Sequence, residues 1–178
     1  SFAIGITSED VEKKLKTREE TVSFLEKSFN VKFKSEKYDL YVLIYLERGI
    51  LEIKPSNLFI EGFYNKYSRE LAQTYHYCYK CKGRGCSFCN RTGKLSDESV
   101  QELIEKECFE LFECKESKFH GCGREDKDVL MLGKGRPFVI ELVEPLKRNF
   151  SLKDLEKKIN SDNKEKISVQ NLKLSSKE

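Results

Sequence analysis

The sequence contains no long hydrophobic run, and the longest one, residues 40–46, has only seven residues. A helix needs about 20 apolar residues to cross a bilayer, so we expect no membrane span and no membrane partner. The first residues also lack the basic segment and the apolar segment of a secretory signal. We therefore expect a cytoplasmic protein, or a nuclear one if the source is a eukaryote.

The composition argues against a disordered chain. Hydrophobic residues make up 38% of the 178 residues, and the chain has 12 Phe and 8 Tyr, more aromatic side chains than disordered segments carry. Charged residues make up 35%, against roughly 25% in an average domain, so the surface is polar. The length predicts one domain or two small ones.

The charges are distributed unevenly along the chain. Residues 61–94 carry seven basic and two acidic side chains, whereas residues 95–146 carry seven basic and 13 acidic ones. A polyanionic partner would meet the basic stretch first. The alternative interpretation is a solvated surface on which charges cluster by chance.

The first third of the chain predicts a helix followed by short strands. Thr17 is a candidate N-cap for a helix that ends at Phe29, with apolar residues on one face. Residues 40–46, 50–53 and 58–60 have the composition of strands, with a turn signal after the first. This pattern predicts a small antiparallel meander beside a helix, which is an α+β unit.

The second half of the chain also mixes helices and strands. A second helix opens near residues 96–98 and has one apolar face, and Ser151 is the candidate cap of a third helix that runs to about Ile159. Residues 137–143 and 167–174 are strand-like. Residues 75–94 have no hydrophobic period, so we expect no regular structure there.

Seven cysteines without a visible secretory signal indicate a reducing compartment, where clustered cysteines bind metal more often than they form disulfides. Two Cys-x-x-Cys pairs, separated by four residues, contain Cys78, Cys81, Cys86 and Cys89. Four thiolates satisfy tetrahedral zinc and leave no position for water, which predicts a structural Zn²⁺ site in a knuckle over residues 75–94. A redox dithiol and an iron–sulfur cluster are alternatives that the spacing does not favour. We interpret Cys108 as a core residue and Cys114 and Cys122 as bystanders.

A second unusual segment spans residues 121–138 and has glycines at both ends. Its first half interleaves three carboxylates with two cations, in the order Arg124, Glu125, Asp126, Lys127 and Asp128. A carboxylate flanked by cations stays ionised, and a fixed loop can aim it into a pocket, as a nucleophile or base requires. Phosphate binding would suit three cations of the segment, Arg124, Lys134 and Arg136. A charged hairpin turn is the alternative that the composition leaves open.

Several strings of residues resemble a known family. The Gly-Arg-Glu-Asp string at 123–126, followed by residues 132–138 ending in Arg-Pro-Phe, resembles the signature of the archaeal and eukaryotic tRNA pseudouridine synthases of the "Pus-ten" type. The resemblance extends upstream through residues 64–69 and 73–74, and includes the cysteine cluster. It covers roughly residues 56–178.

The resemblance implies a function and a domain plan. The family isomerises uridine to pseudouridine in the TΨC arm of tRNA, at position 55 with position 54 as an additional candidate, and uses no organic cofactor. Residues 1–74 would be a THUMP-like accessory unit, residues 75–94 the zinc knuckle, and residues 95–178 the first half of the catalytic domain, part of a mixed α/β pseudouridine synthase fold. The overall class is α+β.

The resemblance also implies roles for individual residues. Asp126 would be the catalytic carboxylate that acts at the ribose C1′ of a flipped-out nucleotide. The RNA-binding wall around it would consist of Arg124, Lys134, Arg136, Lys66, Arg69 and Arg84.

The family's second catalytic half carries a tyrosine that stacks on the target base and a basic partner for Asp126. The sequence stops at Glu178, before that half, so we expect turnover only if a separate chain supplies it. Two other hypotheses stay open. One is a non-catalytic, zinc-containing module that binds tRNA or another RNA, and the other is a chaperone-like role of the cysteine cluster in protein contacts.

Overall fold

A computed structural model describes residues 1–176 of the chain, which fold into two compact units, Ser1–Ser56 and a second unit that begins at Asn57. The last two residues of the expected 95–178 segment lie outside the described residues. No helix among the described residues is both long enough and apolar enough to span a membrane.

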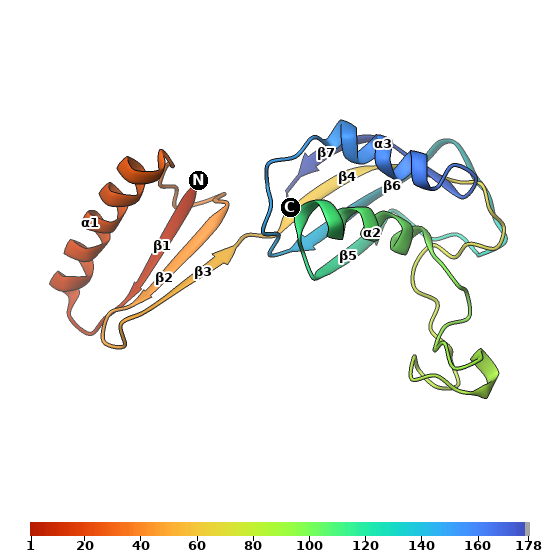
Figure 1. Cartoon of the computed structure of the whole chain (residues 1–178), viewed down its shortest axis with the longest axis horizontal. Coiled ribbons are helices and arrows are strands. Elements are labelled where there is room, and N and C mark those ends of the chain that lie inside the picture. Colours follow the sequence, from red (N-terminus) through yellow and green to blue (C-terminus); the bar gives the residue numbers. More distant parts are fainter. Residues whose placement is uncertain (177–178) are drawn as a thin grey trace. The chain divides into compact units, whose positions relative to one another are not determined.

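The first unit is a three-stranded sheet with one helix on one face (Figure 1). Its elements are β1 (Phe2–Thr7), α1 (Val11–Phe29), β2 (Leu40–Tyr45) and β3 (Ile50–Pro55). The strand order is β1-β2-β3; β1 runs parallel to β2, and β3 runs antiparallel to it. The buried core between sheet and helix contains Phe2, Ile4, Ile6 and Val42.

Helix α1 begins earlier than the sequence predicted. Its N-cap is Asp10, whose carboxylate accepts a hydrogen bond from the Lys13 backbone N–H at 3.0 Å. Thr17 therefore lies inside the helix and does not cap it. The helix ends at the predicted residue, Phe29, because Asn30 adopts a left-handed conformation (φ +49°) that stops it.

The expected antiparallel meander is wrong in two respects. The sheet contains a parallel strand, β1, which the sequence did not predict. The expected third strand at 58–60 belongs to β4 (Leu58–Lys66), which pairs with strands of the second unit and not with β3. The compact units therefore divide after Ser56, and the expected boundary after residue 74 falls inside the second unit.

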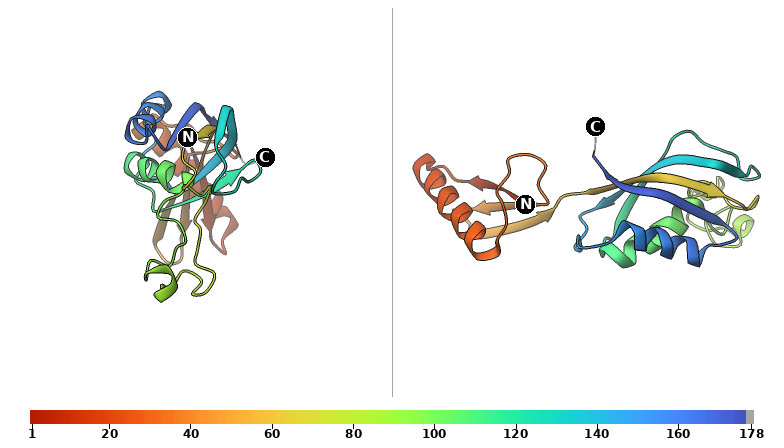
Figure 2. Two further views of the ribbon diagram at one scale, coloured as in Figure 1. Left: turned by 90° about the vertical axis from the view of Figure 1, so that its right-hand side faces the viewer. Right: turned by 90° about the horizontal axis from the view of Figure 1, so that it is seen from above.

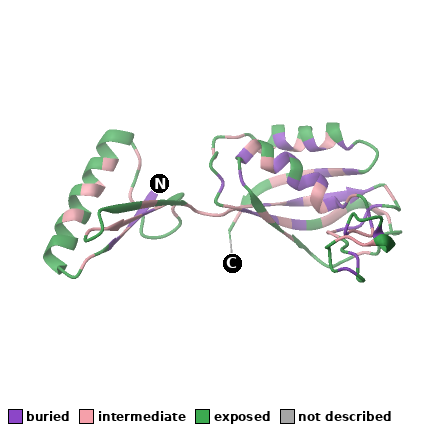
Figure 3. Ribbon diagram, turned by 60° about the horizontal axis from the view of Figure 1, so that its bottom comes forward, coloured by how far each residue is buried: buried purple, intermediate pink, exposed green. Residues whose placement is uncertain are grey.

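The second unit is a four-stranded antiparallel sheet with two helices on one face (Figure 2). Its remaining elements are α2 (Val100–Phe112), β5 (Glu116–Gly121), β6 (Met131–Val143), α3 (Leu152–Asp162) and β7 (Ile167–Ser175), and the strand order is β5-β6-β4-β7. Buried side chains concentrate between the sheet and the helices (Figure 3). The α+β class predicted from the sequence is confirmed.

Both helices of this unit follow local sequence signals. The Ser99 hydroxyl caps α2 by accepting from the Glu102 N–H, close to the predicted start, and Ser151 caps α3 as predicted. The apolar face expected for α2 is buried, including Val100, Ile104 and Cys108. Because capping and periodicity are local properties, the sequence located these helices well.

The segment 75–94 contains a single short 3-10 turn, Ser87–Cys89, as its lack of periodicity predicted. Figure 1 shows it in light green, projecting from the sheet and helices of the second unit.

We predict that the core of the second unit is sensitive to truncation. Leu142 on β6 is 0% exposed, so Leu142→Ala should lower the free energy of unfolding by about 2–5 kcal/mol in urea denaturation, because a cavity replaces buried methyl groups. The matched control is Leu146→Ala, since Leu146 is 68% exposed, and its effect should stay within about 0.5 kcal/mol. Similar losses for both variants would contradict this packing.

Candidate active site and metal centre

The four cysteines of the two Cys-x-x-Cys pairs converge on one point. Their sulfur atoms all lie within 4.8 Å of one another, and three of the Sγ–Sγ distances are 3.8–3.9 Å. Thiolates that share a tetrahedral metal ion at about 2.3 Å lie about 3.8 Å apart, whereas a disulfide brings two sulfurs to about 2.0 Å. The spacing therefore suits a metal ion held by four thiolates.

Backbone N–H groups point at the cysteine sulfurs. Gly85 N–H donates to the Cys81 sulfur at 3.2 Å, and the N–H groups of Cys86 and Gly93 donate to the Cys89 sulfur at 3.3 and 3.2 Å. Burial alone would raise the pKa of the Cys89 thiol, but these donors outweigh it and lower that pKa. The loop therefore favours the thiolate, which is the form that binds metal, at Cys89. At Cys81, burial and the neighbouring thiols raise the pKa to about 11.

Two glycines make this tight loop sterically accessible. A Cβ on Gly93 would lie 2.3 Å from the Gly83 carbonyl oxygen, and one on Gly85 would lie 2.7 Å from the Arg91 carbonyl oxygen. Both glycines also have φ near +80°, a conformation that other residues rarely adopt. The knuckle therefore requires glycine at these two positions.

The other cysteines and histidines lie elsewhere. Cys108 and Cys114 are buried within the core, and Cys122 is exposed. Within residues 1–176, none of them joins the cluster. His76 is exposed and lies beside a surface cleft that Arg124 and Asp126 also line.

The Gly-Arg-Glu-Asp loop connects β5 to β6 and is fastened by a buried lysine. Lys66, the last residue of β4, is 0% exposed, and its ammonium donates to the carbonyl oxygens of Leu71 (2.7 Å), Lys127 (2.8 Å) and Asp126 (3.2 Å). Burial lowers the pKa of Lys66, and the nearby charges of Glu125 and Asp128 oppose that shift. The side chain expected on the RNA-binding wall is therefore an internal support of the loop.

Glu125 anchors the same loop from inside. Its carboxylate accepts from the Tyr64 hydroxyl at 2.6 Å and from the Gln73 amide at 3.0 Å, and lies 2.7 Å from the Arg136 Nε. Gln73 also donates to the Gly123 carbonyl oxygen at 3.0 Å. Burial and the bond to Glu125 raise the pKa of Tyr64, which therefore stays a donor. A buried carboxylate with these partners fixes the conformation of the loop.

Asp126 follows Glu125 but is exposed, and both residues line a cleft of about 360 Å³. The cations Arg124 and Lys127 and the ring of Tyr75 line the same cleft. No cationic group of the described residues lies within ion-pair distance of the Asp126 carboxylate. Its backbone is nevertheless fixed, because its carbonyl oxygen accepts from Lys66 and from the Val129 N–H at 3.1 Å.

Only one of the six predicted wall cations, Arg124, lines the cleft with Asp126. Its guanidinium donates to the Thr74 hydroxyl at 3.3 Å. Arg69 donates to the Asp128 carbonyl oxygen at 2.7 Å, and Arg136 pairs with Glu125. Lys134 is exposed on β6, outside the residues that line the cleft.

Arg84 lies on the knuckle, where its Nε donates to the Cys81 carbonyl oxygen at 3.2 Å. Sequence reasoning gave no role to Glu125, Gln73 or Tyr64. The only available signal was that Tyr64 and Gln73 stand in strings that resemble the family.

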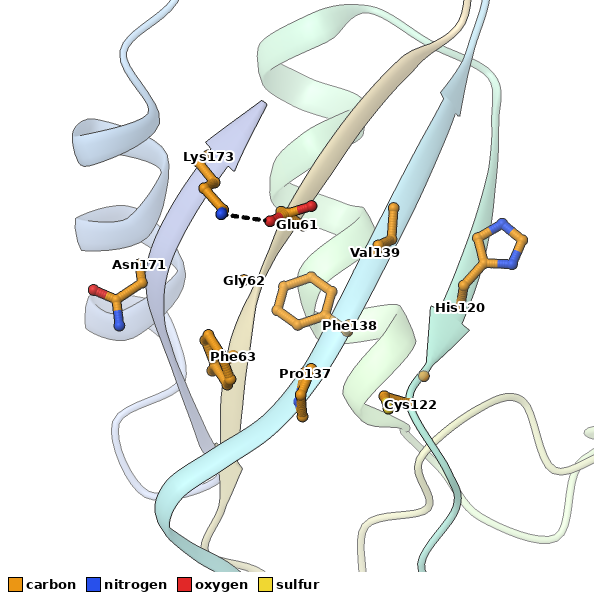
Figure 4. A pocket seen from close by; sticks show the side chains of 11 residues that line it. Glu61, Gly62, Phe63, His120, Cys122, Pro137, Phe138, Val139, Asn171 and Lys173 are labelled. Carbon is orange, nitrogen blue, oxygen red and sulfur yellow. Dashed lines mark ion pairs between the residues drawn. The ribbon is translucent and has the colours of Figure 1, made fainter. Parts of the chain in front are cut away.

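A larger cavity of about 640 Å³ lies on the sheet face opposite the helices (Figure 4). Phe63, Pro137 and Val139 form its apolar floor, and the Lys173–Glu61 ion pair (2.8 Å) lies at one side. Cys122, at the start of the Gly-Arg-Glu-Asp loop, also lines it. The loop therefore borders this cavity as well as the Asp126 cleft.

Comparison with known proteins shows the family to which this chain belongs. Residues 59–178 match the family model described as "Pus10, C-terminal", and the chain belongs to that family. Three relatives carry the name tRNA pseudouridine synthase Pus10. The chain is 48% identical to the one from Archaeoglobus fulgidus over 123 residues, 44% to the one from Methanothermobacter marburgensis over 142, and 46% to the one from Methanocaldococcus jannaschii over 123.

These matches cover 69%, 79% and 69% of this chain but only 34%, 35% and 27% of the relatives. The chain thus spans about a third of the length of the curated relatives it matches. The matched region begins at residue 59, close to the start of the second unit, and contains both the cysteine cluster and the Gly-Arg-Glu-Asp loop.

We predict that Lys66 holds the loop in place. Lys66→Met should lower the free energy of unfolding by about 1–3 kcal/mol, because three carbonyl groups lose their donor, and should speed amide exchange at Val129. Arg69→Met is the matched control, since it removes one hydrogen bond made by an exposed side chain. Equal effects of both substitutions on stability and on exchange would contradict the role of Lys66.

Proposed function

We propose that this chain is part of a tRNA pseudouridine synthase that converts uridine to pseudouridine in the TΨC arm. The observation that carries the proposal is the Gly-Arg-Glu-Asp loop, in which a buried Glu125 and Lys66 fix the backbone while Asp126 faces an open cleft. Relatives of this chain carry the name tRNA pseudouridine synthase. The target is position 55, with position 54 as an additional candidate, and the protein works in the cytoplasm, or in the nucleus of a eukaryote.

The residues of the cleft suit the steps of the reaction. The target uridine leaves its stack and enters the cleft, where Asp126 attacks or deprotonates at the ribose C1′ region. The bond between N1 and C1′ breaks as the Asp126 oxygen bonds to C1′ or takes a proton from the ribose. The uracil rotates, and C5 bonds to C1′ while the bond from Asp126 to C1′ breaks or the ribose regains its proton. The proton on C5 then leaves and N1 gains one. The atoms balance without an organic cofactor. Arg124 and Lys127 supply positive charge for the adjacent phosphates.

The chain supplies only part of such an enzyme, since it spans about a third of its relatives. The remaining catalytic residues, including a tyrosine for stacking, come from a region outside residues 1–178 or from a separate chain. The first unit acts as the THUMP-like accessory unit that contributes to tRNA binding.

The cysteine cluster holds Zn²⁺ in a structural role. Four thiolates favour zinc over magnesium or calcium, which take oxygen ligands. The bound ion would stabilise a segment that has little core of its own, because Leu95 is the one apolar side chain of residues 1–176 that packs against the cluster from outside it.

The role of Asp126 is testable in a chimera in which residues 59–178 replace the matching segment of the Archaeoglobus fulgidus relative. We expect the chimera to release tritium from tRNA labelled at C5 of uracil, and Asp126→Asn to abolish release. Asp128→Asn, two residues further in the same exposed loop, is the control and should retain activity. Activity in the Asp126→Asn chimera would refute the assignment.

The metal proposal predicts one zinc per chain by elemental analysis. Cys81→Ser should lose the ion, because it removes one of four thiolates, and should expose residues 75–94 to proteolysis. Cys122→Ser is the control, since Cys122 is exposed and lies outside the cluster. Retention of zinc by Cys81→Ser, or iron in place of zinc, would contradict the proposal.

A second candidate is a non-catalytic, zinc-containing module that binds tRNA or another RNA. The observation that favours it is the exposed Asp126 carboxylate, which has no cation at ion-pair distance among the described residues. This candidate predicts tRNA binding that survives Asp126→Asn, is lost with the metal, and is never accompanied by isomerisation.

A further inference from the structure

Each Cys-x-x-Cys pair carries one aromatic residue between its cysteines. Tyr79 lies in the first pair and Phe88 in the second. Their rings meet at a centroid distance of 5.4 Å and an interplanar angle of 63°. We call this pair the knuckle platform. The two pairs therefore present a joint aromatic surface as well as a joint metal site.

The knuckle platform is open to solvent, since Tyr79 is 65% exposed and Phe88 is 48% exposed. The metal site itself is largely closed, since Cys78, Cys81 and Cys89 are 8% exposed or less and Cys86 is half-buried. Two large rings exposed side by side, away from the core, are costly in water unless a partner covers them.

The surroundings of the platform are cationic. The sequence contains no acidic residue from Leu71 to Ser96 but has five cations there: Lys80, Lys82, Arg84, Arg91 and Lys94. Four thiolates around a divalent ion carry two net negative charges, which these cations outnumber. Lys80 lies over the Phe88 ring, 3.8 Å from its centroid, and the first four cations are exposed. The surface therefore combines π-faces with positive charge.

Positive charge beside exposed aromatic rings fits an unpaired stretch of RNA, in which bases stack on rings and cations follow the phosphates. A duplex hides its base faces, and an acidic protein surface would use the charges but not the rings. We infer that the knuckle platform stacks an unpaired base of the RNA substrate, beside and distinct from the Asp126 cleft. The inference rests on the proposed function for the choice of RNA as ligand.

The test uses the 178-residue chain and a short unstructured RNA that carries one 2-aminopurine. We expect the Tyr79→Ala/Phe88→Ala variant to bind it about 5- to 150-fold more weakly than wild type, the range for losing one stacked base, and to stop quenching its fluorescence. A blunt RNA duplex of the same length should bind both proteins alike. Unchanged affinity for the single strand, or an equal loss for both RNAs, would overturn the inference.

Three further variants separate stacking from folding. Tyr79→Leu/Phe88→Leu keeps apolar volume but removes the π-faces, so it should retain its metal and lose binding; if it binds like wild type, the inference fails even where the alanine variant misfolds. Tyr79→Phe/Phe88→Tyr keeps both rings and should bind normally. Leu146→Ala removes another exposed apolar side chain of the same unit and should have no effect.

The outcome is distinguishable from that of the proposed function. If the chimera shows no isomerisation but oligonucleotide binding still requires the rings of Tyr79 and Phe88, the proposed function is refuted and the stacking site is supported. If isomerisation depends on Asp126 but the affinity for the oligonucleotide does not change when the rings are removed, only the stacking site is refuted.

Discussion

The second unit depends on one buried charge. The Lys66 ammonium lies inside the protein, where an unpaired cation would be prohibitively costly, and it stays there because three carbonyl groups accept its hydrogens. Two of those carbonyls belong to Asp126 and Lys127, some 60 residues further along the chain. The same bonds that satisfy the lysine therefore attach the loop to the end of β4.

This attachment gives two neighbouring carboxylates opposite environments. The Glu125 side chain is buried against Tyr64, Gln73 and Arg136, whereas Asp126 is exposed in the cleft that both residues line. The inner carboxylate has partners for its lone pairs and acts as an anchor. The outer one has a fixed backbone and an accessible side chain, which is the combination that a reacting group needs. The functional hypothesis for Asp126 thus depends on the burial of its neighbour.

The sequence predicted the local elements of the fold better than the pairing of its strands. Helices α2 and α3 were located because serine caps and apolar periodicity act within a few residues. The sequence analysis missed strand β1 and assigned β4 to the wrong sheet. The residues of a short apolar strand do not specify which other strand will pair with it. Lys66 was expected at the surface for a related reason. The sequence around a lysine in a basic stretch does not show whether carbonyl groups elsewhere in the chain will accept hydrogen bonds from its ammonium group.

The amino-acid sequence alone determined the cysteine cluster, because its four thiols lie within residues 78–89 and two short knuckles with glycines suffice to bring them together. It also determined the family, through strings such as Gly-Arg-Glu-Asp. Only the tertiary structure brought residues 64–74 into contact with the Gly-Arg-Glu-Asp loop. It also decided that the side chains of Lys66 and Glu125 are buried, and that Arg124 alone of the expected cations lines the Asp126 cleft. The physical reason is distance along the chain: these contacts join residues about 50 to 60 positions apart, so they exist only once β4, β5 and β6 form one sheet.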